Sequence, residues 1–156
     1  MIEQAFTHAT SLGGLFLWSF LAATLVPLSS EAALSAAHAM AVAPPGLLFA
    51  AALAGNVCGA LVNWFLGLWC LRFQHKRWFP VTPVQLQKAE ARFRRWGAWT
   101  LLFSWIPVVG DPLTFVAGAL HYPLARFLIV VTIGKAARYA AILWITDVVL
   151  PIFTAS

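Results

Sequence analysis

Long apolar runs fill most of the chain, and helix breakers interrupt two of them. The run from residue 103 to residue 120 is long enough to enter a bilayer, but proline, glycine and an acid break it at its middle: Pro107, Gly110, Asp111 and Pro112. A helix does not continue through such a stretch. Irregular backbone at membrane depth survives only where protein or water satisfies its polar groups. The pattern therefore predicts a re-entrant helical hairpin over residues 97–121, with a polar site beside the break.

An earlier run has the same form. Residues 13–26 are apolar and end at Pro27, and fourteen residues of helix rise about 21 Å, short of the ~30 Å hydrocarbon thickness. Ser29 or Ser30 can cap a new helix whose first turn holds Glu31. We therefore expect a first re-entrant hairpin over residues 13–43.

Two further runs are unbroken and long enough to cross a membrane with some tilt, over residues 46–71 and 124–150. In the first of them Gly55, Gly59 and Asn63 recur every four residues, a narrow stripe of small side chains that predicts close packing against another membrane helix. With 62% hydrophobic and 10% charged residues, the chain is expected to be a single all-α integral membrane domain over residues 1–156. Cys58 and Cys70 lie about 18 Å apart on the first span, so we expect buried thiols and no disulfide.

Residues 72–96 are the one polar segment, and they hold seven of the ten Lys and Arg residues. The positive-inside rule predicts that this segment is cytoplasmic. Within it a short amphipathic helix is expected, with a basic face on the membrane surface formed by Lys88, Arg92 and Arg95. That face serves either orientation and anchoring alone or binding of anionic headgroups. Nucleic acid is not expected as a partner.

The two halves of the chain repeat each other. At a shift of 80 residues Pro27 falls on Pro107 and Glu31 on Asp111, and at 79 residues Gly55-Asn56 falls on Gly134-Lys135. Each half is then a hairpin followed by a span, half 1 over about 13–71 and half 2 over about 97–150. Because a hairpin returns to its own side, each half crosses the membrane once, and the halves form an inverted repeat with the basic segment inside.

This repeat predicts that Glu31 and Asp111 approach each other near the membrane midplane. Helix N-termini favour the carboxylate, whereas desolvation favours the neutral acid. A carboxyl group balanced between these effects is a candidate proton carrier. Ordinary capping of a helix start explains both acids equally well.

Lys135 and Arg138 are three residues apart and share a face near the centre of the last span. An unpaired cation there costs about 2.5 to 3.5 kcal/mol on insertion scales. Both residues therefore need acidic partners, for which Glu31 and Asp111 are the candidates. Two interpretations stay open, a structural ion pair and a site for an anionic headgroup.

Other chemistry finds no support in the sequence. The four histidines lack ligand spacing, so no metal site is expected, and no cofactor motif or catalytic triad is present. We expect no enzyme activity.

Several short motifs resemble the YqaA-like branch of the DedA superfamily, the SNARE-associated or VTT-domain membrane proteins. They are Phe93-Arg94-Arg95-Trp96-Gly97, Ser104-Trp105-Ile106-Pro107-Val108-Val109-Gly110-Asp111-Pro112, Ala117-Gly118, Gly134-Lys135 and Arg138-Tyr139. The resemblance covers about residues 20–150. It implies an inner-membrane protein with two re-entrant hairpins that moves or scrambles lipids, with suspected dependence on the proton gradient. In the better-known DedA branch arginines flank the proline of the second hairpin; here Lys135 and Arg138 are candidates for supplying that charge.

The leading hypothesis is a multi-pass inner-membrane transporter or scramblase of an anionic lipid, in which Glu31 and Asp111 handle protons and Lys135 and Arg138 the headgroup. The alternatives are a non-transporting membrane scaffold and a transporter of ions or small solutes that uses the same site. Membrane lipids and protons are the expected partners, and a homo-oligomer stays open.

Overall fold

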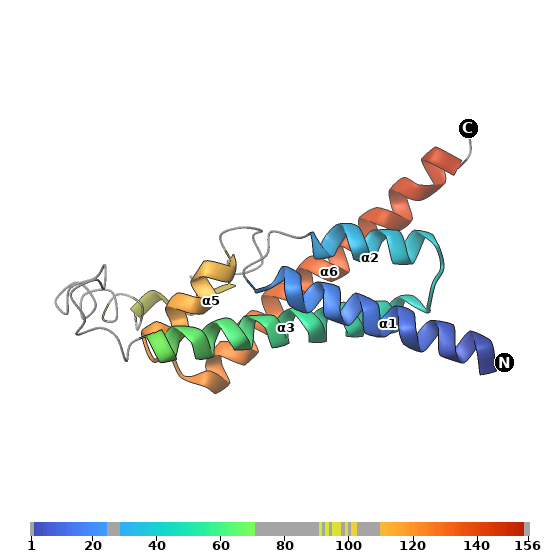
Figure 1. The fold of residues 1–156 in the computed structure, drawn as a ribbon. Coiled ribbons are helices and arrows are strands. Elements are labelled where there is room, and N and C mark those ends of the chain that lie inside the picture. The colour runs from blue at the N-terminus through green and yellow to red at the C-terminus, as the bar shows by residue number, and fades with distance from the viewer. Residues whose placement is uncertain are drawn as a thin grey trace. The chain divides into compact units, whose positions relative to one another are not determined.

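The computed structural model describes residues 2–24, 29–70 and 110–154, together with residues 91, 93, 95–97, 99, 101 and 102. Every element assigned within these residues is an α-helix (Figure 1): α1 (Ile2–Ala22), α2 (Ser30–Ala39), α3 (Pro45–Cys70), α5 (Gly110–Ala119) and α6 (Leu124–Thr154). Two stretches are long and apolar enough to cross a membrane, Pro45–Cys70 and Leu124–Val149. They match the two predicted spans, so the all-α class and both long apolar helices are confirmed.

Two helix ends differ from the prediction. α1 begins at Ile2, eleven residues before the expected start, because the chain has no helix breaker before Gly13. α6 continues through Pro151 to Thr154; a proline this near the end removes a single backbone hydrogen bond. The breaks at Pro27 and Pro107 lie outside the described residues, and the re-entrant course of the two hairpins stays a prediction.

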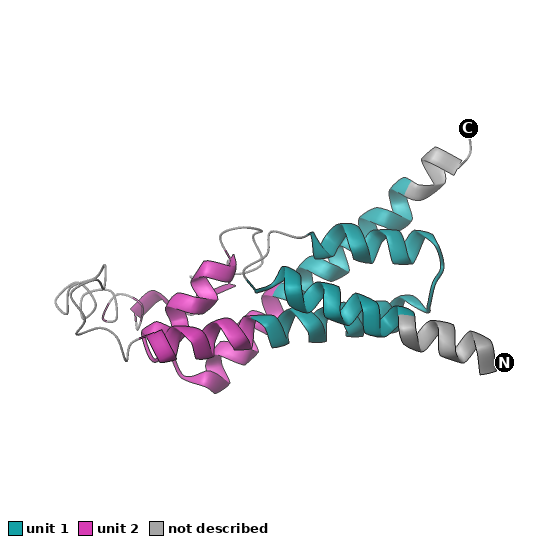
Figure 2. Ribbon diagram, in the orientation of Figure 1, with its two compact units in different colours: residues 1–59, 135–156 teal, residues 60–134 magenta. Residues whose placement is uncertain are grey.

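The chain divides into two compact units that exchange parts of the long helices (Figure 2). Unit 1 comprises residues 1–59 and 135–156, which are α1, α2, the first part of α3 and the last part of α6. Unit 2 comprises residues 60–134, which include the last part of α3, α5 and the first part of α6. Each unit therefore combines one predicted hairpin with the start of its own span and the end of the other span.

Large apolar side chains are exposed along both long helices. On α3 they include Phe65 and Trp69, and on α6 Ile129, Ile133 and Trp144. Contact between such apolar surfaces and water is unfavourable, whereas contact with the hydrocarbon of a membrane is not. Cys58 is also exposed and Cys70 is half-buried, so the expectation of buried thiols is wrong, because these positions face outward on α3.

In unit 1 the small-residue stripe of α3 packs directly on α1. A Cβ added at Gly55 would overlap the carbonyl oxygen of Phe16, and one added at Gly59 would lie 2.6 Å from the carbonyl oxygen of Phe20. Only glycine lets two helix backbones approach this closely. The predicted close packing of this stripe is confirmed, and its partner is α1.

Replacing Gly55 by alanine should destabilise the protein by about 1–3 kcal/mol, because the new methyl group forces α1 and α3 apart. Gly13→Ala is the matched control, since it lies in α1 with nothing within 4 Å of the added Cβ. It should instead stabilise by about 0.5–1 kcal/mol through helix propensity. Thermal denaturation in detergent measures both, and equal effects would contradict the close contact.

The end of α2 and the end of α5 have the same backbone geometry 80 residues apart. α2 and α5 are both ten residues long, and each is followed by a left-handed residue, Ala41 with φ 50° and His121 with φ 54°. Three backbone hydrogen bonds recur at the same shift: Met40 N to Ala36 O, Ala41 N to His38 O and Val42 N to Ala37 O, then Leu120 N to Val116 O, His121 N to Gly118 O and Tyr122 N to Ala117 O. The repeat predicted from the sequence therefore extends to local structure.

Buried positions of the long helices also repeat, at a shift of 79 residues: Leu48 and Phe127, Ala52 and Val131, Gly55 and Gly134, Asn56 and Lys135. α3 and α6 therefore bury equivalent faces.

Ala41→Gly should stabilise the protein by about 1 kcal/mol, because glycine adopts the left-handed conformation without the steric cost that alanine bears. Ala39→Gly, inside the last turn of α2, should destabilise by a similar amount. Melting temperatures of the two variants test this difference in sign.

Candidate functional site

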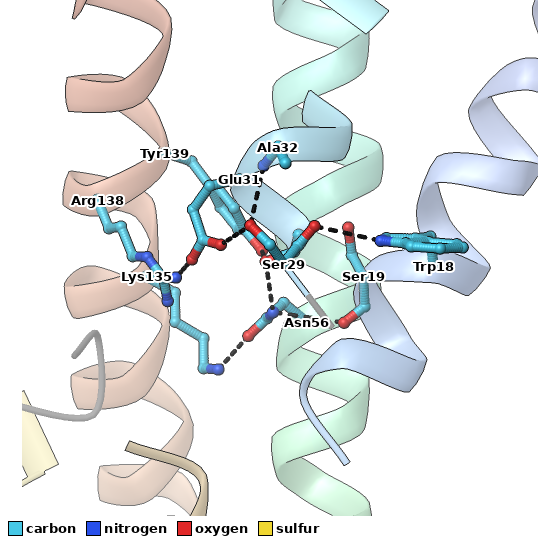
Figure 3. A network of polar contacts seen from close by, with 10 residues as sticks. Trp18, Ser19, Ser29, Glu31, Ala32, Asn56, Lys135, Arg138 and Tyr139 are labelled. Carbon is cyan, nitrogen blue, oxygen red and sulfur yellow. Dashed lines mark hydrogen bonds and ion pairs between the residues drawn. The ribbon is translucent and has the colours of Figure 1, made fainter. Parts of the chain in front are cut away.

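A buried lysine and a buried asparagine form the centre of the polar contacts in unit 1 (Figure 3). Lys135 on α6 is 2% exposed and Asn56 on α3 is 3% exposed, and Lys135 Nζ donates a hydrogen bond to Asn56 Oδ1. Asn56 Nδ2 in turn donates to the carbonyl oxygen of Ser19 (3.3 Å) and to Ser30 Oγ (3.4 Å). One amide thus links the cation of α6 to α1 and α2.

Tyr139, one turn beyond Lys135, closes this arrangement. Its side chain is buried, and its hydroxyl donates to Ser30 Oγ at 2.9 Å. Ser30 is the first residue of α2 and is itself buried. We call Ser30, Asn56, Lys135 and Tyr139, with the ion pair described next, the central network.

Arg138 forms an ion pair with Glu31. The side chains are 13% and 23% exposed, respectively, so both charged groups lie largely within the protein. The prediction that Arg138 needs an acidic partner, with Glu31 as a candidate, is confirmed. Breaking such a pair from one side leaves an uncompensated buried charge.

The start of α2 holds Glu31 in place. Ser29 is the N-cap: its hydroxyl accepts from the backbone N–H of Ala32 at 3.1 Å and donates to Glu31 Oε2 at 2.7 Å. Trp18 on α1 donates through Nε1 to the Ser29 carbonyl oxygen at 3.2 Å. The cap predicted from the sequence therefore coexists with the ion pair, and Glu31 serves both.

Asp111 lies in unit 2, in the first turn of α5, and is half-buried. Thr114 Oγ1 donates to the Asp111 carbonyl oxygen at 2.6 Å and accepts from Asn63 Nδ2 at 3.3 Å. Both Asn63 and Thr114 are buried. Gly110 and Pro112 also belong to the first turn of α5, so this part of the predicted break is the start of a helix.

Among the predicted basic residues, Lys88 and Arg92 lie outside the described residues. Arg95 is exposed, with its guanidinium carbon 6.0 Å from the centre of the Trp96 ring. Phe93 is buried in unit 2 and meets Tyr122 edge to face at 5.4 Å. Phe93 packs inward and Arg95 outward, as the predicted amphipathic pattern requires, while Trp96 is 55% exposed.

Sequence reasoning missed two contacts between α2 and α6. His38 Nε2 lies 2.6 Å from Asp147 Oδ1, and Thr146 Oγ1 donates to Ser35 Oγ at 3.1 Å. The signal was present in the spacing of Glu31, Ser35 and His38, which recur at i, i+4 and i+7 in an otherwise alanine-rich segment. Asp147 lies nine residues beyond Arg138 on α6, about 13 Å along the helix axis, and its partner is His38.

No group of three His, Cys, Asp or Glu side chains is arranged to hold a metal ion in the described part of the chain. What the site offers is a buried ammonium, a guanidinium–carboxylate pair and several hydroxyl groups.

These features define an all-helical membrane protein with charged groups inside its spans. The VTT domain profile matches residues 26–148. Inner membrane protein YqaA of Escherichia coli (strain K12) and its namesake in Shigella flexneri are each 39% identical over 138 residues, covering 87% of this chain and 91% of the relative. An uncharacterized protein of Haemophilus influenzae is 31% identical over 153 residues, or 90% of each chain. No solved structure matches.

The chain therefore belongs to the VTT-domain family, in the YqaA-like branch of the DedA superfamily. The expected resemblance is confirmed, and with it a membrane location.

Proposed function

We propose that this protein moves an anionic lipid between the leaflets of the inner membrane, coupled to protons, without acting as an enzyme. Lys135 and Arg138 recognise the headgroup, and Glu31 and Asp111 exchange protons. The observation that carries the proposal is the buried cationic pair of Lys135 and Arg138 inside a membrane span, with Arg138 held by Glu31. Buried charges in a span are costly and are usually retained for function.

The proposed topology is an inverted repeat, in which α3 and α6 cross the membrane, both hairpins are re-entrant and residues 72–96 are cytoplasmic. One observation supports it. Asn56 and Lys135 are equivalent in the repeat and contact each other, and residues equivalent under a two-fold axis meet only close to that axis.

Charge exchange supplies the mechanism. Glu31 neutralises Arg138 in the described state, so an arriving phosphate or carboxylate headgroup can replace it as the partner of the guanidinium. A released Glu31 carboxylate in a poorly solvated site favours protonation. Headgroup binding and proton uptake would thus accompany each other, and Asp111 would perform the equivalent step in the other half.

A second candidate, a non-transporting scaffold, is favoured by the packing of the central network. Ser30, Asn56, Lys135 and Tyr139 are at most 3% exposed and hydrogen-bonded to one another. A scaffold needs no more than this, because satisfied buried polar groups fix a unique packing.

Reconstitution in proteoliposomes separates the two functions. A fluorescent anionic phospholipid placed in the inner leaflet should become accessible to an external quencher with the wild-type protein, faster with an imposed pH gradient. Asp111→Asn should weaken the dependence on the gradient, because it removes one of the two acids proposed to exchange protons. Lipid movement no faster than in protein-free vesicles, with the protein folded, would exclude transport and favour the scaffold.

A further inference from the structure

Four polar contacts join α2 to the last part of α6, and we call them together the α2–α6 seam. Its four contacts are Glu31 with Arg138, Ser30 with Tyr139 (2.9 Å), Ser35 with Thr146 (3.1 Å) and His38 with Asp147 (2.6 Å). Residue numbers rise together on the two helices, so α2 and α6 run parallel along the seam.

The two ends of the seam differ in exposure, and the Glu31 side chain is 23% exposed. Tyr139 and Ser30 at one end are 1% and 3% exposed. At the other end the His38 side chain is 13% exposed and the Asp147 side chain 66%. The seam therefore connects the central network with the surface of unit 1.

The side chains of the seam are suited to carrying protons. Hydroxyl groups both donate and accept hydrogen bonds, and imidazole takes up and releases protons near neutral pH. Carboxyl groups stand at both ends, Asp147 with a side chain that is 66% exposed and Glu31 with one that is 23% exposed. The charged or titratable groups that face the seam are Glu31, His38, Lys135, Arg138, Tyr139 and Asp147; the adjoining described side chains of α1 and α3 carry no charge.

Charge and packing indicate whether a proton or a lipid headgroup moves along the seam. An anionic headgroup would be repelled by the Asp147 carboxylate at the exposed end of the seam, whereas a proton is attracted. The inner end is also closely packed, with Ser30 Oγ within 3.4 Å of the Asn56 amide. A proton can be relayed through such contacts, but a headgroup would have to break them.

We infer that the α2–α6 seam is a proton path from the His38–Asp147 pair, of which Asp147 is exposed, to Glu31. The proton enters at Asp147, which is exposed, and passes to His38, whose Nε2 lies 2.6 Å from Asp147 Oδ1. Ser35 and Thr146 each accept one proton on the hydroxyl oxygen as they pass their own on. Along α2, Glu31, Ser35 and His38 follow one another at about one helical turn, or 5–6 Å, a gap that one water molecule can bridge. Glu31 receives the proton, becomes neutral and releases Arg138, so one proton has moved from water to one carboxylate.

This inference deepens the proposed function and rests on it for the use made of the proton, but it can be tested separately. Infrared difference spectroscopy on the full chain in liposomes, after an acid pH jump, follows protonation of Glu31, whose band is identified by its loss in Glu31→Gln. Ser35→Ala/Thr146→Val and His38→Gln should each slow this protonation about 100-fold, the lower range for a positioned proton-transfer group. Thr146→Ser, which keeps the hydroxyl, should retain the wild-type rate.

Thr132→Val is the matched control, because it removes a hydroxyl from α6 in unit 2, outside the seam. Unchanged protonation rates in the seam variants, or a Glu31 that never takes up a proton, would overturn the inference and leave the seam a structural contact. Glu31 protonation through the seam without any lipid movement would uphold the inference and refute the proposed transport. Lipid movement by the protein, together with normal protonation of Glu31 in the seam variants, would overturn the inference and uphold the proposed transport.

Discussion

Lys135→Met should reduce transport of an anionic lipid about 30-fold or more, because a buried charge that binds its partner contributes about 2–5 kcal/mol. The folded state should be little affected. Removing the buried ammonium also removes its desolvation penalty, which is several kcal/mol per ion. Leaving Asn56 Oδ1 without its lysine donor costs about 1–3 kcal/mol, which offsets the gain. The lipid-accessibility assay and thermal denaturation, measured on the same preparation, check both statements.

Arg126→Met provides the matched control, since Arg126 is an exposed cation on the same helix and outside the central network. It should transport normally. Lys135→Arg, which keeps the charge, should retain a substantial part of the wild-type rate. Wild-type transport by Lys135→Met would show that the ammonium group is structural and would remove the main support for headgroup recognition.

The long-range features that could be predicted are those for which the residue types alone imply a large free-energy cost or gain. Two unbroken apolar stretches can only be long helices, and α3 and α6 match them within a residue or two at the membrane-crossing windows. Arg138 inside such a stretch requires an acid, and few acids exist to choose from, so Glu31 could be proposed. Local hydrogen-bonding rules alone predicted a serine N-cap, Ser29 or Ser30, and the structure uses Ser29.

The contacts that could not be predicted depend on the register between helices. Ser35 and Thr146 lie 111 residues apart, and His38 and Asp147 lie 109 apart; only the packing of α2 against α6 decides that they meet. Asn56 was aligned with Lys135 by the repeat, but alignment shows equivalence and not contact. Contact follows only if the symmetry axis passes beside these residues.

Removing either member of the Glu31–Arg138 pair should destabilise the protein by about 3–5 kcal/mol, whereas removing both should cost far less. Glu31→Gln leaves Arg138 as an uncompensated buried cation, and Arg138→Gln leaves the carboxylate. In Glu31→Gln/Arg138→Gln neither charge remains, and two amides can still form hydrogen bonds. Denaturation of the two single variants and the double variant, compared as a double-mutant cycle, measures the coupling. Additive losses would contradict a direct ion pair.

Transport by the double variant then distinguishes a structural role of the Glu31–Arg138 pair from a role in transport. If the pair only fastens α2 to α6, the double variant recovers transport together with stability. If Arg138 exchanges Glu31 for a headgroup, the double variant is stable but moves no lipid, because the exchanging charges are gone. We expect the second outcome: two opposite charges that only held helices together could be replaced by apolar residues at no loss of stability, whereas a charge that changes partners cannot.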